Sequence, residues 1–161
     1  MIQRANHKDV MIDTVHMNHR AMMETLTISS RPIFNTHSNL ITFSLHPRNV
    51  QNSFVRALAD RGGLLGLSVY KNFVQMQDCE ASIALYCHQI QHCSDRGGDD
   101  VVGFESDYHG LMMDDIVFGC EKIFEIDRLY DAVIDLLFGC NCAEKFFAGN
   151  DLRALEAYGL V

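Results

Sequence analysis

The chain has 161 residues, of which 48% are hydrophobic and 21% are charged. This length predicts one domain over residues 1–161 with enough chain to bury a core, and the apolar content excludes a disordered protein. The 21 acidic residues outnumber the 13 Lys and Arg, which gives a net charge of −8. Nucleic acid and anionic membrane surfaces are therefore not expected partners.

The cellular context follows from the N-terminus and the cysteines. No apolar run reaches the roughly 18–20 residues that cross a bilayer, and Arg4, Lys8 and Asp9 stand where a signal peptide has its apolar segment. The six cysteines include no Cys-x-x-Cys pair, and we interpret them as reduced thiols, several of them in the core. The sequence therefore predicts a cytoplasmic protein without a membrane partner.

The first part of the chain predicts two strand–helix units. A strand is expected over residues 10–16, followed by a helix over His19–Ile28 with Asn18 as its N-cap. A second strand is expected over residues 32–36. It leads through a loop to a second helix, for which Asn49 is the expected N-cap.

The rest of the chain predicts two more units. A third strand is expected over residues 64–69, which are apolar on both faces as buried parallel strands are. A long helix follows over residues 78–94 and ends at Gly97-Gly98, before a fourth strand over residues 101–104. Further helical segments are expected at about 120–137, at 142–148 and from Asp151.

Strands that alternate with helices favour parallel pairing, so the predicted fold class is α/β with parallel (βα) units. His16, His37 and Asp107 each follow one of the predicted strands. Ligands of parallel α/β folds bind at that carboxyl edge. The pattern does not choose between a small open sheet and part of a barrel.

These three residues, together with Arg48 in the loop after the second strand, have two interpretations each. His16 and His37 can share one divalent cation, or each can be a structural histidine at a strand end. Arg48 can hold a substrate carboxylate or form a surface salt bridge. Asp107 can act as a general base or cap a helix.

The pair His88 and His92, one helical turn apart, is a rival metal site. No Glu follows His88, so this is not a zincin motif, and we interpret both histidines as solvated.

Five segments together match a known pattern in order and spacing: Ile12–His16, Pro32–Asn39, His46–Val50, Arg61–Gly66 and Val102–Gly110. They resemble the membrane (renal) dipeptidase family. Its members are zinc-dependent (βα)8 barrels of the amidohydrolase type, about twice this length, that hydrolyse dipeptides. The match covers the C-terminal half of that barrel, about four strands with their helices, so the resemblance implies a partial barrel.

The resemblance also implies a role for individual residues. His16 and His37 take the places of the ligands to the second zinc. Arg48 takes the place of the arginine that binds the C-terminal carboxylate of the dipeptide, and Tyr70 falls near an aromatic residue of the pocket. Asp107 takes the place of the aspartate that moves the proton.

This sequence departs from the family at several positions. The family's His-x-Asp pair for the first zinc and its bridging glutamate lie in the half that is not matched. Val15 stands where the family has Ser, and His109 stands where it has a second acid. The expected function is thus a zinc-dependent dipeptidase that is inactive alone, completed by a homo-oligomer or by a complementary N-terminal half barrel. The alternative is a non-catalytic, truncated or degenerate metal-binding or dimerising module.

Overall fold

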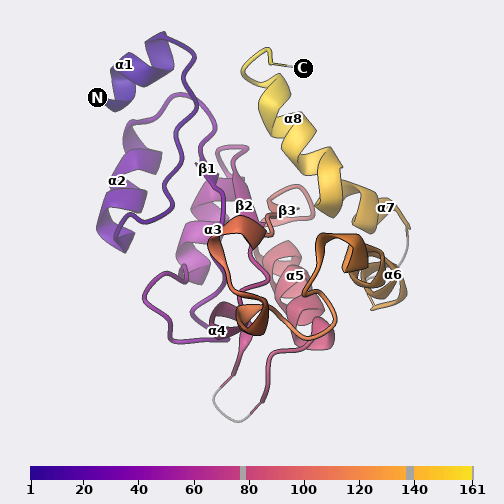
Figure 1. Cartoon of the computed structure of the whole chain (residues 1–161). Coiled ribbons are helices and arrows are strands. Elements are labelled where there is room, and N and C mark those ends of the chain that lie inside the picture. The colour runs from indigo at the N-terminus through magenta and orange to yellow at the C-terminus, as the bar shows by residue number, and fades with distance from the viewer. Residues whose placement is uncertain (77–78, 137–139, 161) are drawn as a thin grey trace.

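The computed structural model describes residues 1–76, 79–136 and 140–160, and Figure 1 shows its elements in order. Three strands form one sheet, β1 (Phe34–Asn35), β2 (Leu64–Leu67) and β3 (Val102–Phe104), in that order. The α-helices are α1 (Ile2–His7), α2 (His19–Ile28), α3 (Asn52–Ala59), α4 (Lys71–Val74), α5 (Ile83–Gly97), α6 (Ile126–Leu136), α7 (Cys140–Glu144) and α8 (Asn150–Glu156). Three 3-10 turns, Tyr108–Gly110, Met113–Asp115 and Ile123–Glu125, and a π-helical turn, Lys145–Gly149, complete the described elements.

Both strand pairs are parallel, which confirms the predicted fold class. Phe34 lies beside Leu64, and Leu65 lies beside Val102. Gly66 is required in the middle strand, because a Cβ atom there would lie 2.2 Å from the carbonyl oxygen of Thr36. The backbone of the neighbouring strand therefore approaches β2 as closely as only glycine allows.

The prediction of a strand over residues 10–16 is wrong. Only an isolated parallel bridge joins Asp13 to Phe34, with Phe34 N donating to Ile12 O and Thr14 N donating to Phe34 O. The chain then turns, because Val15 N donates to the Asp13 side chain and His16 adopts a φ of 66°. Extended pairing ends where this left-handed residue begins.

The two predicted N-caps have different outcomes. Asn18 does cap α2, since its side-chain oxygen accepts from Ala21 N at 2.9 Å. The prediction for Asn49 is wrong, because α3 begins after Gln51 and has no side-chain cap. The Asn49 amide instead donates to the carbonyl oxygens of Ser44 and Phe73, both at 3.0 Å.

Two predicted helix starts lie too early in the sequence. Residue 78 is outside the described residues, and α5 begins at Ile83 because the Ser82 hydroxyl accepts from Leu85 N. The helix expected from residue 120 is α6, which begins at Ile126 after a 3-10 turn. The stops at Gly62 and Gly98 are confirmed, with φ values of 65° and 80°.

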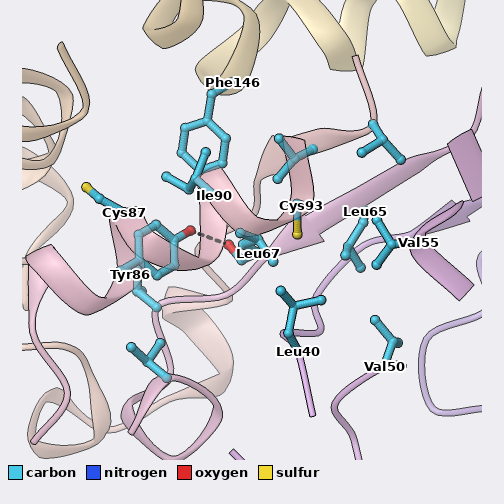
Figure 2. Packing of buried hydrophobic residues seen from close by; sticks show 14 of the residues in the cluster. Leu40, Val50, Val55, Leu65, Leu67, Tyr86, Cys87, Ile90, Cys93 and Phe146 are labelled. Carbon is cyan, nitrogen blue, oxygen red and sulfur yellow. Dashed lines mark hydrogen bonds between the residues drawn. The ribbon is translucent and has the colours of Figure 1, made fainter. Parts of the chain in front are cut away.

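The main core lies between the sheet and the helices α3 and α5, as the packed side chains in Figure 2 show. Tyr86 of α5 is fully buried and donates its hydroxyl to Leu67 O of β2 at 2.6 Å. Burial raises the pKa of this phenol well above its ordinary value. The hydroxyl therefore stays protonated and joins the longest helix to the central strand.

The opposite end of the sheet from α4 is covered by α8 (Figure 1). Arg153 donates to Gly62 O, just before β2, and to Asp100 O, just before β3. Asn150, a buried residue of the same helix, donates its side-chain amide to Val102 O at 2.7 Å. The C-terminal helix therefore closes the amino ends of the strands and leaves the carboxyl ends to the loops.

The described residues bear on two predictions about the cellular context, one on membrane-spanning segments and one on reduced cysteines. None of the helices in the described parts of the chain is long and apolar enough to cross a membrane. The cysteines described as free are Cys79, Cys87, Cys93, Cys120 and Cys142. The cytoplasmic location stays a prediction.

Candidate functional site

A cleft of about 610 Å³ lies at the carboxyl ends of the strands. It is lined by His16, His37, His46, Arg48, Tyr70, Phe73, Asp107, Gly110, Leu111 and Asp115. All five residues to which the family resemblance assigned a role are in this set. The sheet brings them together because each follows a different strand or loop at the same edge.

The two predicted metal-binding histidines are neighbours. The ring centroids of His16 and His37 are 5.3 Å apart, and the rings meet edge to face at 75°. His37 follows β1 by two residues, whereas His16 is presented by a left-handed turn. A turn and a strand end thus place two imidazoles side by side.

The charge state of His37 is set by its surroundings. Burial lowers the pKa of His37 below its ordinary value, and the positive charge of Arg48 acts in the same direction. Asp107 and Asp13 oppose this shift without reversing it. Near neutral pH the ring is therefore held in the neutral form, which is the form that binds metal.

Arg48 has no anionic partner among the described residues, whose salt bridges involve other cations. Its Nε and Nη2 atoms, which form the edge that carboxylates bind with two hydrogen bonds, are buried without an acceptor. The guanidinium carbon lies 5.8 Å from the centroid of the Phe73 ring. Leaving a buried donor pair on a cation unsatisfied costs free energy, and an anion would satisfy it.

An aromatic wall adjoins Arg48. The Phe73 ring lies 4.7 Å from the His46 ring and 4.8 Å from the Tyr70 ring, centroid to centroid. Tyr70 is held by Asn72, whose amide donates to the Tyr70 hydroxyl at 2.6 Å. The cleft therefore combines a cationic end with an apolar side.

Asp107 has a backbone conformation that few residues of its type adopt, with a φ of 54°. Its carboxylate fills the space in front of Gly110, where a Cβ atom would lie 2.6 Å from the Asp107 Oδ1 atom. The 3-10 turn Tyr108–Gly110 follows directly. The carboxylate lines the cleft, where it can accept or donate a proton.

Three further histidines of interest lie outside the cleft. His109 is exposed and does not line it. His88 is exposed on α5, while His92 lies against Asn52 with a contact of 3.1 Å to its Oδ1 atom. His88 is thus solvated as expected, whereas the same expectation is wrong for His92, which is half-buried against Asn52.

The imidazole nitrogens in the cleft are of a type that binds zinc, but the cleft supplies few of them. His16 and His37 supply two imidazole nitrogens, whereas catalytic zinc has three or more protein ligands as a rule. The described residues contain no group of three or more His, Cys, Asp or Glu side chains arranged to hold a metal ion. The two histidines therefore fit zinc as part of a site.

Sequence reasoning missed some of the lining residues. His46, Phe73, Leu111 and Asp115 were not predicted to belong to the site. His46 had a local signal, since it precedes Arg48 by two residues, and Arg48 N donates to its Nδ1 atom at 3.2 Å. Asp115 had no such local signal in the sequence, because its position depends on how the loop after β3 folds back.

Comparisons with known proteins agree with the geometry. The model of the membrane dipeptidase family (peptidase family M19) matches residues 1–160. An uncharacterized dipeptidase, C965.12, of Schizosaccharomyces pombe is 29% identical over 97% of this chain and 38% of its own length. The dipeptidase tcpJ of Claviceps purpurea is 24% identical over 97% of this chain and 36% of its own length.

Solved structures share the fold. A metallo peptidase from Rhodobacter sphaeroides, crystallised with a phosphinate mimic of the dipeptide L-Ala-D-Ala, superposes with a TM-score of 0.90 at 22% identity. The match covers 98% of this chain and 45% of that one. The chain thus spans about two fifths to one half of the proteins it matches. Its fold is part of the barrel those structures contain, and the chain belongs to the membrane dipeptidase family, peptidase family M19.

Proposed function

We propose that residues 1–161 form one partial-barrel domain that serves zinc-dependent hydrolysis of dipeptides. The observation that carries this proposal is the single cleft that collects His16, His37, Arg48, Tyr70 and Asp107. These residues come from separate parts of the sequence and meet at the carboxyl edge of the sheet. Membership of the dipeptidase family supports the proposed reaction class.

Arg48 binds the C-terminal carboxylate of the dipeptide in this proposal. Its Nε and Nη2 atoms provide two parallel donors and have no other acceptor. Tyr70 and Phe73 then flank the dipeptide on the apolar side of the cleft.

Asp107 transfers the proton. It lies on the same cleft wall as the histidines and acts on the charge of His37, so it is near the place where the scissile bond must lie. As a carboxylate it accepts the proton of the attacking water, and as a carboxylic acid it donates that proton to the leaving amine. His16 and His37 would hold a zinc ion, which when bound polarises the peptide carbonyl and acidifies water.

A pair of ligands that differ at one group tests the binding role. A dipeptide and its C-terminal amide are titrated into the zinc-loaded protein, and we expect the free carboxylate to bind at least about tenfold more tightly, as removal of a charged hydrogen-bonded pair does. Arg48→Met should bind both ligands equally weakly. Arg56→Met, an exposed arginine of α3, is the matched control and should behave as the wild type. Equal binding of acid and amide by the wild type would refute the role of Arg48.

A turnover assay tests whether His16 and His37 alone supply enough metal ligands for dipeptide hydrolysis. We propose that dipeptide hydrolysis needs further metal ligands from a second copy of the chain or from a complementary half barrel. The purified chain with zinc should then be inactive at a concentration where it is monomeric, as judged by light scattering. Turnover by the monomer that is lost in His37→Ala would contradict this requirement while supporting the reaction. Zinc binding without turnover in any assembly would instead favour a non-catalytic metal-binding module.

A further inference from the structure

One carboxylate joins the two loops that carry the histidines. Asp13 Oδ1 accepts from Val15 N at 3.0 Å and from Thr36 N at 3.2 Å, while Asp13 Oδ2 accepts from Thr36 Oγ1 at 2.7 Å. Val15 immediately precedes His16, and Thr36 immediately precedes His37. Asp13 therefore ties the turn before one imidazole to the strand end before the other.

The Thr36 hydroxyl also contacts His37, with 3.1 Å between Thr36 Oγ1 and His37 Nδ1. A hydroxyl has one proton to donate and two lone pairs to accept with. The Asp13 carboxylate accepts only, and its contact with the hydroxyl is the shorter of the two. The hydroxyl proton is therefore directed at Asp13, so the contact with His37 must be a hydrogen bond in which Nδ1–H donates to Thr36 Oγ1.

We propose that Asp13 and Thr36 are positioning residues that fix the tautomer of His37. The neutral ring carries its proton on Nδ1 and keeps the lone pair on Nε2. Such a ring offers Nε2 to an electrophile in the cleft, and its orientation is fixed by the same hydrogen bond. Only the use of that lone pair for zinc rests on the proposed function; the tautomer itself does not.

The variant Asp13→Asn reverses the direction of the two hydrogen bonds that involve the Thr36 hydroxyl, with little change in shape. The oxygen of the introduced side-chain amide must face the two backbone N–H groups of Val15 and Thr36, because these donate. The NH2 group of that amide then faces Thr36 Oγ1 and donates to it. The Thr36 hydroxyl consequently turns its proton toward His37 Nδ1, which favours the tautomer protonated on Nε2.

The tautomer is read directly by long-range 15N–1H NMR of the metal-free protein at a pH above the pKa of His37. We expect the Nδ1–H form in the wild type and in Thr36→Ser, and the Nε2–H form as the major species in Asp13→Asn. Thr36→Val removes the hydroxyl and should give a mixture of both forms. Asp60→Asn, at the exposed end of α3, is the matched control and should leave the wild-type pattern unchanged.

Two results would overturn the proposal. The first is a wild-type protein with mainly Nε2–H at His37, and the second is a Thr36→Val variant that keeps pure Nδ1–H. Backbone amide spectra confirm that each variant is folded, and Thr36→Val tests the same contact if Asp13→Asn does not fold. The signals of His88 and His92 on α5 serve as an internal reference.

Titration with zinc chloride separates this proposal from the proposed function. If the lone pair of Nε2 is a zinc ligand, Asp13→Asn should weaken zinc binding by about 10–100-fold, the range found when the outer partner of a ligating histidine is changed. Thr36→Ser should stay close to the wild type. If the tautomers follow the expected pattern while zinc affinity does not change, the positioning role stands and the zinc site fails.

Discussion

His16 and Asp107 have positive φ values of 66° and 54°, and both line the cleft. Asp9 is the other non-glycine residue of this kind in the described parts of the chain. L-residues with a Cβ atom adopt the left-handed region at a cost, so such residues persist where the surrounding structure holds them. At His16 and Asp107, a strained backbone conformation thus accompanies a side chain that lines the cleft.

This strain predicts that glycine is the more stable substitute at position 16. His16→Gly and His16→Ala both remove the imidazole, but only alanine keeps the Cβ atom that disfavours a φ of 66°. We expect the glycine variant to exceed the alanine variant by about 1–2 kcal/mol in free energy of unfolding. Urea unfolding measures the difference, and equal midpoints and slopes would show that the turn relaxes without strain.

We expect the raised pKa of Glu105 to make the free energy of unfolding depend on pH. Burial, together with the negative charges of Asp151, Asp13 and Asp107, raises the pKa of Glu105 to about 7 from 4.5. The folded chain thus holds this proton more tightly than the unfolded chain, so the free energy of unfolding falls as the pH rises from about 4.5 to about 7.

The variant Glu105→Gln should remove that contribution. We expect it to be more stable than the wild type at pH 8 by about 1–2 kcal/mol, once solvent screening of a half-buried group is allowed for, and similar to it at pH 4.5. A shallower fall should remain, because burial also raises the pKa of Asp151 to about 6. Thermal unfolding at a series of pH values measures this; parallel curves for the two proteins would contradict it.

At the scale of elements, three buried amides join the loop after β1, the helix α4 and the helix α5. Asn39 Nδ2 donates to Gln89 Oε1 at 3.0 Å, and Asn39 N donates to Asn49 Oδ1 at 3.2 Å. Gln89 in turn donates to Phe73 O and Val74 O. The network holds the end of the loop that carries His46 and Arg48, because Asn49 directly follows Arg48 in the sequence.

Breaking this network should be expensive. Gln89→Leu leaves the side-chain NH2 group of Asn39 and Val74 O without their partner in the core, while Phe73 O keeps its hydrogen bond from the Asn49 amide, so we expect a loss of about 1–3 kcal/mol in free energy of unfolding. Gln91→Leu on the same helix removes only an exposed contact with Asp95 and should change stability by less than about 0.5 kcal/mol. Equal effects of the two variants on the urea midpoint would show that the buried network contributes nothing.

Helix and strand positions were predictable where the signal is local. Asn18 caps α2 and Gly62 ends the segment after α3 as expected, because a cap or a left-handed glycine acts within one turn. Asn49 misled the prediction, since its amide binds the distant Phe73 O instead of a neighbouring helix. An asparagine that caps and one that joins two loops look the same in a sequence.

At the scale of the whole molecule, α8 determines how the sheet ends. Leu65 N of β2 donates to Val101 O, so the next carbonyl oxygen, Val102 O, points away from β2. The buried side-chain amide of Asn150 donates to Val102 O. Asn150 also donates to Asp99 O. The outer edge of β3 is thus partly paired within the chain, although an unpaired edge invites association.

Removing this amide should expose that edge. We expect Asn150→Ala to lose about 2–3 kcal/mol in free energy of unfolding, because two hydrogen bonds are lost and Val102 O is left unsatisfied. Association that rises with concentration should accompany the loss. Urea unfolding and light scattering measure the two effects, with the exposed Glu156→Ala on the same helix as control. A variant as stable and as dispersed as the control would contradict this account of the edge.

The sequence by itself determined the parallel (βα) units, the residue types at the strand ends and the family, because periodicity, glycine stops and motif spacing are properties of neighbouring residues. Only the tertiary structure decided that His16, His37, Arg48, Tyr70 and Asp107 share one cleft with His46. It also decided that residues 10–16 turn instead of forming a strand, and that Asp13 reaches Thr36. The contacts of His16 with His37 and of Asp13 with Thr36 join residues more than 20 positions apart, so they depend on sheet register and packing, which no local pattern specifies.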